Sequence, residues 1–324
     1  MTAPDKPARV DPALPRPLGR TGLAVTPICI GTSPLASMPG LYGYTVDAQR
    51  AEATVEAVLD GPLNFLDTSN SYGGGEAERR IGAVLRRRAQ PAGFVLATKV
   101  DADPETGDFS GERVRRSAEE SLRRLGVDRV PLLYLHDPEY HITFEQAMAP
   151  GGAVEALVAL RDAGVAGHLG IAGGPIDLLR RFVHTGVFEA VISHNRWTLV
   201  DRSAAPLLDA AAAAGVGFVN GAPYGGGILV KGAEAQPKYA YRAAGEQIRT
   251  AAAAMQRACA AAGVPLAAAA LQFSLRDPRV AATIVGVSTP DRIAQTLALA
   301  ETPIPAALWA ELDRCAPAPQ TWLG

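Results

Sequence analysis

The chain has 324 residues, of which 48% are hydrophobic and 20% are charged, and its formal net charge is −2. This length provides a sizeable core, and α/β barrels of a single domain are commonly this long. The near-neutral charge, without a basic stripe, excludes the electrostatic pattern of proteins that bind nucleic acid or an anionic membrane surface. We therefore expect a small-molecule substrate as the partner, while the oligomeric state stays open.

The N-terminus and the cysteines bear on where the protein resides. Residues 1–17 are rich in proline and charge and lack the apolar stretch of a signal peptide or membrane span. We expect a flexible lead-in there, followed by one domain over residues 18–324. Cys29, Cys259 and Cys315 stand far apart and form no CxxC pair. This usage predicts neither a disulfide framework nor a metal site, and it fits a reducing, cytoplasmic setting.

Beyond Gly22, short apolar runs alternate with amphipathic stretches, each pair taking about 30 to 40 residues, which is typical of βαβ units. The predicted strands are Val25–Ile30, Asn64–Leu66, Phe94–Lys99, Val130–His136, His168–Ile171, Ala190–Ile192, Gly217–Asn220 and Thr283–Val285. The predicted helices are Val46–Leu59, Glu76–Arg88, Gly111–Leu125, Ala153–Ala163, Ile176–His184, Ala204–Ala214, Gly245–Ala262, Pro265–Leu275, Asp291–Leu299 and Pro305–Arg314. Eight strands alternating with helices predict an α/β fold, a (β/α)8 TIM barrel with additional C-terminal helices.

The glycine-rich runs have different expected roles. Gly73-Gly74-Gly75 follows no strand with a GxGxxG or Walker pattern, so we interpret it as a turn and reject a Rossmann fold. The longest irregular segment, residues 221–243, follows the seventh predicted strand and contains Gly225-Gly226-Gly227. Glycines allow a close backbone approach to a pyrophosphate, and long structured loops are often functional.

Polar residues end several predicted strands. Asp67, Lys99 and His136 each stop an apolar run, and Tyr72 follows Asp67 closely. Taken singly, these residues have plain explanations as a helix N-cap, a solvated lysine, a core histidine and a packing tyrosine. The carboxyl ends of parallel strands meet at one face of a barrel, however, so together the four predict an assembled proton-transfer site.

These four residue types suit proton exchange at a carbonyl or hydroxyl oxygen. A tyrosine has a pKa near 10, and an adjacent ammonium such as Lys99 favours the phenolate. Asp67 would keep the lysine in place and protonated, and His136 would hydrogen-bond the substrate oxygen. Hydride exchange with a nicotinamide would complete an oxidation or a reduction.

The motifs that carry these residues resemble those of the aldo-keto reductase family. They are Phe65-Leu-Asp-Thr-Ser-Asn-Ser-Tyr-Gly73, Ala97-Thr-Lys99 and Leu135-His-Asp137, and the likeness extends from Leu18 to about residue 300. The resemblance implies a barrel enzyme with Tyr72 as general acid or base, Lys99 and Asp67 as its tuning pair, and His136 as the group that orients the substrate.

Further motifs resemble one branch of that family. Asn220–Leu229, Pro237–Arg242 and Leu135–Glu139 are similar to the branch that includes D-threo-aldose 1-dehydrogenase, L-fucose dehydrogenase and pyridoxal 4-dehydrogenase. This implies oxidation of a cyclic hemiacetal to its lactone, with Tyr72 taking the anomeric hydroxyl proton. An NADPH-dependent reductase of aldehydes or ketones is the alternative, and a non-catalytic cofactor-binding regulatory subunit is the alternative of another class.

The resemblance also implies a bound NAD or NADP. The cofactor contacts that it implies are Gly31, Thr32, Asp67, His194, Pro223, Tyr224, Gly225, Gly227, Gly286, Ser288, Arg292 and Gln295. A lysine that pairs with the 2′-phosphate in many NADP-preferring relatives aligns with Gly286, whereas Arg292 keeps an arginine. The loss of that lysine favours NAD.

Residues that hold the nicotinamide in the family differ in this chain. Ala172-Gly173 stand where the family commonly has Ser-Asn, and His194 stands in place of a glutamine. Gly221 aligns with an aromatic residue that often stacks on the ring. We therefore expect other groups to hold the amide, such as His194, Asn195 or backbone amides of the glycine loop.

Overall fold

Eight parallel strands close into a barrel in the computed structural model, which describes residues 10–324. In barrel order they are β12 (Val280–Gly286), β3 (Ile28–Gly31), β4 (Phe65–Asp67), β5 (Val95–Val100), β6 (Val130–His136), β7 (Ala166–Gly173), β8 (Ala190–His194) and β9 (Gly217–Gly221). The last strand, β12, pairs with both β3 and β9 and thereby closes the ring. The predicted barrel is confirmed.

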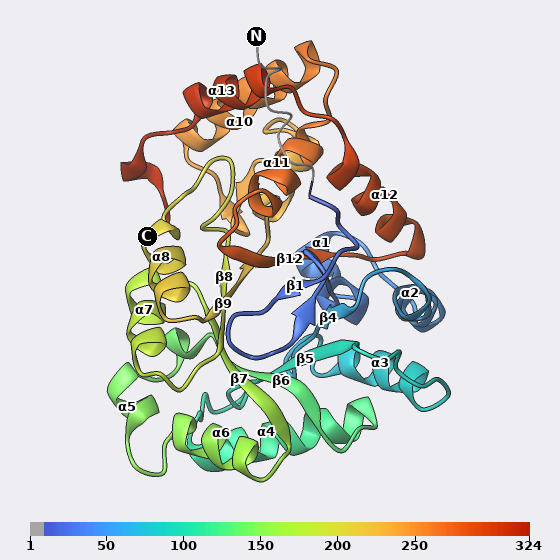
Figure 1. Cartoon of the computed structure of the whole chain (residues 1–324), viewed down its shortest axis with the longest axis vertical. Helices are drawn as coiled ribbons and strands as arrows, with labels where there is room; N and C mark the ends of the chain where they lie inside the picture. Colours follow the sequence, from blue (N-terminus) through green and yellow to red (C-terminus); the bar gives the residue numbers. More distant parts are fainter. Residues whose placement is uncertain (1–9) are drawn as a thin grey trace.

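Helices surround the strands on the outside (Figure 1). They are α2 (Ala48–Asp60), α3 (Glu76–Leu85), α4 (Gly111–Leu125), α6 (Ala153–Asp162), α7 (Ile176–His184), α8 (Ala205–Ala213), α11 (Leu266–Leu275) and α12 (Pro290–Glu301). The helices α10 (Glu246–Ala261) and α13 (Ala306–Cys315) pack against each other instead. Local chemistry sets their limits. In α4, the Ser110 hydroxyl accepts a hydrogen bond from the Arg113 backbone N–H, and Gly126 ends the helix with a φ of 69°.

Apolar side chains fill two concentric layers. The inner layer lies inside the barrel and includes Phe65, Leu132, Tyr134 and Val219. The outer layer lies between the strands and the helices. Leu18 is fully buried and belongs to the inner layer. This packing makes the barrel a solid support, so function is confined to its loops and strand ends.

The segment before the first barrel strand differs from the prediction. Ala24–Val25 (β2) pairs antiparallel with Arg16–Pro17 (β1), and the barrel strand begins only at Ile28. Pro27 lies between β2 and that strand, and it carries no N–H for a ladder hydrogen bond. The flexible lead-in expected over residues 1–17 is therefore wrong for residues 16 and 17, whereas residues 1–9 lie outside the described residues.

Several short elements have no counterpart among the predicted ones. They are the helices α1 (Pro39–Tyr42), α5 (Phe144–Met148) and α9 (Ile228–Lys231), the 3-10 turns η1 (Ser33–Ala36), η2 (Pro138–Tyr140), η3 (Gly225–Gly227) and η4 (Pro319–Thr321), and the hairpin of β10 (Lys238–Tyr239) and β11 (Arg242–Ala243). Elements of two to five residues are too short to show a periodic apolar pattern. The segment 221–243, expected to be irregular, thus holds a 3-10 turn, a helix and a hairpin.

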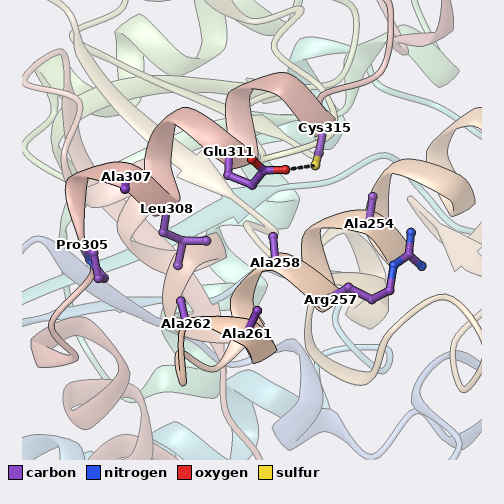
Figure 2. Close-up of a pocket in the computed structure, with 10 residues that line it drawn as sticks. All are labelled: Ala254, Arg257, Ala258, Ala261, Ala262, Pro305, Ala307, Leu308, Glu311 and Cys315. Atoms are coloured by element: carbon purple, nitrogen blue, oxygen red, sulfur yellow. Dashed lines mark hydrogen bonds between the residues drawn. The ribbon is translucent and has the colours of Figure 1, made fainter.

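The alanine-rich stretch of the sequence forms parts of α10 and α11, and α13 packs against α10. A hollow of about 600 Å³ lies between α10 and α13, lined mainly by small apolar side chains (Figure 2). No residue of a barrel strand lines it. Among residues 10–324, no single helix has the length and apolar character of a membrane span. Helices α10 and α11 have that length and apolar character only when they are counted together, and a 103° bend separates them.

Helices α3 and α4 approach closely at Gly82, which gives a test of the packing. A Cβ at Gly82 would lie 1.9 Å from the Arg124 carbonyl oxygen. Helix propensity favours alanine over glycine by about 1 kcal/mol, but backbone overpacking costs about 1–3 kcal/mol or more. We expect Gly82→Ala to lower the free energy of unfolding in urea by at least about 1 kcal/mol.

Gly40→Ala is the matched control, because no heavy atom of another described residue lies within 4 Å of a Cβ at Gly40, the neighbours along the chain and the helix backbone aside. Its unfolding free energy should stay within about 0.5 kcal/mol of the parent. Equal stability of Gly82→Ala and the parent would contradict this account of the helix contact.

Candidate active site

The structure brings the four predicted residues together at the carboxyl end of the barrel strands. Asp67 is the last residue of β4, Lys99 lies one residue before the end of β5, and His136 ends β6. Tyr72 lies in the turn that connects β4 to α3. Because β4, β5 and β6 are neighbours in the barrel, their ends converge on one side of its mouth.

Lys99 is the centre of a hydrogen-bonded chain. Its ammonium nitrogen donates to Asp67 Oδ1 at 2.7 Å, to the Thr68 carbonyl oxygen at 2.7 Å and to Tyr72 Oη at 3.0 Å. These three bonds use all three donors of the ammonium group. Lys99 and Asp67 are each 2% exposed, so water competes little for either group. The lysine is therefore fixed in one position beneath the tyrosine hydroxyl.

The charges of Asp67 and Lys99 determine which groups of this hydrogen-bonded network are protonated. Burial lowers the pKa of Lys99, but the Asp67 carboxylate outweighs burial and raises that pKa above its ordinary value. Burial raises the pKa of Tyr72, and the Lys99 ammonium opposes this without overcoming it. The expected effect of the lysine on the tyrosine is thus present but smaller than that of burial. At neutral pH, Lys99 is therefore an ammonium ion and Tyr72 is a neutral phenol.

A second carboxylate, Asp101, contacts the histidine. His136 Nδ1 lies 2.7 Å from Asp101 Oδ1 and 3.1 Å from Ser69 Oγ. Burial lowers the pKa of His136, but Asp101 and Asp137 outweigh it, so that the pKa is raised. The sequence prediction missed Asp101. The signal for it was its position two residues after Lys99, because alternate residues of a strand point to the same side.

The loop that carries Tyr72 is anchored on both sides. The Asn70 side-chain amide donates to the Ser117 carbonyl oxygen at 3.0 Å, and Arg124 donates to the Asn70 carbonyl oxygen at 3.0 Å. The Ser71 backbone N–H donates to Asp101 Oδ2 at 3.0 Å. These bonds hold Tyr72 in position before any substrate binds, which is the supporting arrangement that a precise site requires.

A cluster of acceptors lies beside this network. Asp137, with a φ of 45°, places Oδ1 3.7 Å from His194 Nε2, and Glu139 Oε1 accepts the Gly174 backbone N–H at 2.7 Å. His136 and His194 lower the pKa of Asp137 to about 2, although burial alone would raise it. Asp137 Oδ1 and Glu139 Oε2 are buried with no hydrogen-bond partner among residues 10–324. Two unpaired acceptors of this kind suit the hydroxyl or amide donors of a bound molecule.

Asp137, Glu139 and His194 also bring potential ligand atoms within 4.8 Å of one another, a set that could hold a cation. Glu139 Oε1 is already engaged by Gly174. The expected absence of a metal site stays a prediction.

Neighbouring side chains lie close to Gly173 and Gly221, two of the positions that differ from the family. A Cβ at Gly173 would lie 2.9 Å from Glu139 Oε2, and one at Gly221 would lie 3.1 Å from His194 Cβ. The Glu139 carboxylate and the His194 ring thus border the space that the smaller residues leave. This places a carboxylate and an imidazole side chain beside positions at which the resemblance implies amide and hydroxyl side chains.

Two of the expected cofactor contacts have structural roles. Thr32 is fully buried, and its hydroxyl donates to the Asp67 carbonyl oxygen at 2.9 Å, which ties β3 to β4. A Cβ at Gly31 would lie 2.7 Å from Ile284 Cγ2, so the glycine is required by packing between β3 and β12. Their expected contact with a cofactor stays a prediction.

The other expected contacts lie on two neighbouring segments at the mouth. Pro223 and Tyr224 lead into η3, where Gly225, Gly226 and Gly227 have φ values of 58°, 75° and 103°. A Cβ at Gly225 would lie 2.4 Å from the Tyr239 ring, so this glycine is also required by packing.

The second segment is the end of β12 and the first turns of α12. It holds Gly286, Ser288, Arg292 and Gln295, and exposed Arg292 donates to Gln295 Oε1 at 3.2 Å. Within residues 10–324, no side chain caps the start of α12, and among its first N–H groups that of Arg292 donates to the Thr289 carbonyl oxygen. A helix N-terminus without a side-chain cap, beside an arginine, fits the phosphates of a dinucleotide.

Comparison with known proteins shows the family of the chain. The model of the aldo/keto reductase family matches residues 27–317. L-galactose dehydrogenase of Arabidopsis thaliana is 31% identical over 87% of this chain and 86% of its own length. D-threo-aldose 1-dehydrogenase of a Pseudomonas species is 32% identical over 90% of this chain and 94% of its own length.

The fold has solved counterparts as well. The holo form of aldo-keto reductase AKR11C1 from Bacillus halodurans superposes with a TM-score of 0.74 at 23% identity, covering 94% of this chain and 96% of that chain. At this identity the likeness concerns the fold.

The buried ion pair gives a prediction for stability. Lys99→Met leaves the Asp67 carboxylate buried without its partner, which should lower the free energy of unfolding at pH 7 by about 3–5 kcal/mol. Burial raises the pKa of Asp67 above that of the unfolded chain, so the folded variant binds the proton more tightly and regains stability as the pH falls. Urea unfolding at several pH values measures both effects.

The double variant Lys99→Met with Asp67→Asn is the control, because it removes the unpaired charge. It should recover more than half of the lost stability at pH 7. A double variant as unstable as Lys99→Met would show that the charge is not the cause.

Proposed function

The chain belongs to the aldo/keto reductase family of oxidoreductases, and from this premise we propose that it oxidises a sugar or other cyclic hemiacetal to its lactone with NAD(P). The observation that carries the proposal is the chain from Asp67 through Lys99 to Tyr72 beside His136. The names of the two relatives, an L-galactose and a D-threo-aldose dehydrogenase, support an aldose-like substrate.

Tyr72 is the proposed proton-exchanging group. During oxidation the anomeric O–H bond breaks and its proton moves to Tyr72 Oη, while the hydride leaves the same carbon and the C=O bond forms. Lys99 stabilises the phenolate that receives the proton, and Asp67 keeps Lys99 charged. Bound nicotinamide supplies the hydride acceptor, and its positive charge when oxidised favours the phenolate.

The opposite direction is the second candidate. The raised pKa of Tyr72 makes its phenol a proton donor at neutral pH, as the reduction of an aldehyde or ketone by NADPH requires. The same four residues serve both directions. The presence of all four residues, Asp67, Tyr72, Lys99 and His136, argues against a non-catalytic regulatory subunit.

The cofactor site is proposed from residues that fit a dinucleotide. Arg292, Ser288 and the uncapped start of α12 would hold phosphates, and the backbone of η3 would approach the pyrophosphate. The unpaired acceptors of Asp137 and Glu139 would receive the nicotinamide amide or a substrate hydroxyl. Gly286 presents no positive group, which favours NAD.

A sugar-like substrate also fits the exposed tyrosines on the loops of the mouth. Tyr44 follows α1 in the segment between β3 and α2 and is 42% exposed, and Tyr241 lies between β10 and β11 and is 48% exposed. An aromatic face packs well against the apolar face of a sugar ring, while acceptors such as Asp137 Oδ1 receive its hydroxyls.

A cytoplasmic location is part of the proposal. The three cysteines are free thiols, and two of them, Cys29 and Cys259, are buried. Free thiols of this kind are compatible with a reducing compartment.

Tyr72→Phe tests the catalytic role directly. Loss of the hydroxyl should lower kcat by at least about 100-fold, with a smaller effect on cofactor affinity. Initial rates with NAD and NADP against L-fucose, D-arabinose, L-galactose, pyridoxal and simple aldehydes provide the measurement. Tyr140→Phe, at a side chain that is 69% exposed, is the control and should keep the parent rate. An undiminished rate in Tyr72→Phe would remove the tyrosine from its role.

Gly286→Lys tests the cofactor preference. A Cβ at this position meets only the Pro34 side chain, at 3.1 Å, so a longer side chain can be accommodated with a small shift. We expect the lysine to lower the Kd of NADPH relative to that of NADH by about tenfold, measured by cofactor fluorescence. Gly286→Met, of similar length without charge, should leave the ratio unchanged. An unchanged ratio in Gly286→Lys would place the 2′-phosphate elsewhere.

A further inference from the structure

Asp101 forms the closest polar contact of the His136 ring. Asp101 follows β5 directly and is 8% exposed. Its Oδ1 atom lies 2.7 Å from His136 Nδ1. A carboxylate accepts but does not donate, so Nδ1 carries the hydrogen in this contact. The other ring nitrogen, Nε2, is then the atom left for a ligand at the mouth.

The carboxylate is itself held in a fixed position. Ser69 Oγ donates to Asp101 Oδ2 at 2.5 Å, and the Ser71 backbone N–H donates to the same oxygen at 3.0 Å. The Asp101 backbone N–H donates to Ser117 Oγ at 3.0 Å, and Arg113 Nε donates to the Asp101 carbonyl oxygen at 3.0 Å. Both ends of the residue are therefore bound to α4 and to the loop that carries Tyr72. Such a residue can determine the orientation of the ring that it contacts.

Other ionisable groups also face His136. Asp137 Oδ2 lies 3.8 Å from Nε2 and favours the charged ring, whereas the Lys99 ammonium disfavours it. The Tyr72 ring meets the His136 ring edge-on, with centroids 5.9 Å apart, and the Asp67 charge is neutralised locally by Lys99. Two carboxylates thus favour the protonated His136 ring and one ammonium disfavours it. Of these three charged groups, only Asp101 lies within hydrogen-bond distance of the ring.

We propose that Asp101 is a positioning residue for the reaction, which orients the His136 ring and keeps it protonated so that Nε2–H donates to the substrate oxygen. This role rests on the proposed function for the identity of the oxygen that is bound. In oxidation, the donor stabilises the oxygen as its proton moves to Tyr72; in reduction, it polarises the carbonyl. Asp101 thus orients His136 and favours its charged form, as Asp67 does for Lys99.

The alternative is that Asp101 only tethers the Tyr72 loop through Ser69 and Ser71. Asp101→Asn separates the two roles, because the asparagine oxygen can still accept the Ser71 N–H and hold the loop, whereas the amide nitrogen that then faces His136 Nδ1 carries no charge. A tether alone would leave the His136 titration unchanged. A charge-based role would move it.

The experiment is a titration of the imidazole nitrogens by long-range ¹⁵N–¹H NMR on the full chain. The chain has five histidines, so the His136 signals can be assigned from their loss in His136→Gln. We expect the His136 pKa of the parent to lie above about 6.5. In Asp101→Asn it should fall by about one unit or more, and the limb of the kcat/KM profile that reports His136 should move to lower pH by the same interval.

Asp103→Asn is the matched control, because Asp103 lies on the same loop and, among the described residues, forms hydrogen bonds only within that loop. It should leave the His136 pKa unchanged. An unchanged pKa in Asp101→Asn would overturn the proposal, and so would a parent pKa at or below about 6.5, which needs no variant to fold. If the NMR shift is seen but no hemiacetal is oxidised, the protonation role stands while the proposed substrate class fails.

Discussion

The buried ion pair between Lys99 and Asp67 is the interaction on which the rest of the site depends. Both charges are nearly inaccessible to water, and their attraction and hydrogen bonds must offset a desolvation penalty of several kcal/mol for each ion. The barrel provides the required geometry, because β4 and β5 are hydrogen-bonded neighbours whose register places Asp67 opposite Ala97. The lysine held in this way is what brings an ammonium to 3.0 Å from the Tyr72 hydroxyl.

Two short polar chains run side by side from the end of β5. One leads from Asp67 through Lys99 to Tyr72, and the other leads from Asp101 to His136. Lys99 and Asp101 are two residues apart, so the alternation of side chains along a strand directs both toward the same region. Each chain begins with a buried carboxylate and ends at a group that can exchange or donate a hydrogen to one substrate oxygen. The groups proposed to react therefore lie on one side of the barrel mouth.

Sequence reasoning predicted what depends on periodic patterns and strand ends. The alternation of strands and helices was clear. Helix α4 has the predicted limits because its caps agree with its apolar spacing, and α7 has them although no side chain among residues 10–324 caps its start. Asp101 was missed because it comes after the strand and no apolar run stops on it. The roles of Thr32 and Gly225 depend on the contacts with Asp67 and Tyr239, residues distant in sequence whose approach only the folded chain reveals.

The most direct test of the account follows hydrogen from the substrate. A sugar that the chain oxidises, labelled with deuterium at the anomeric carbon, should transfer the label to C4 of the reduced nicotinamide and yield the lactone as the first product, as detected by NMR and mass spectrometry. Tyr72 and His136 then act on the oxygen of the carbon that loses the hydride. A reduced nicotinamide without deuterium, or a product oxidised at another carbon, would contradict the account.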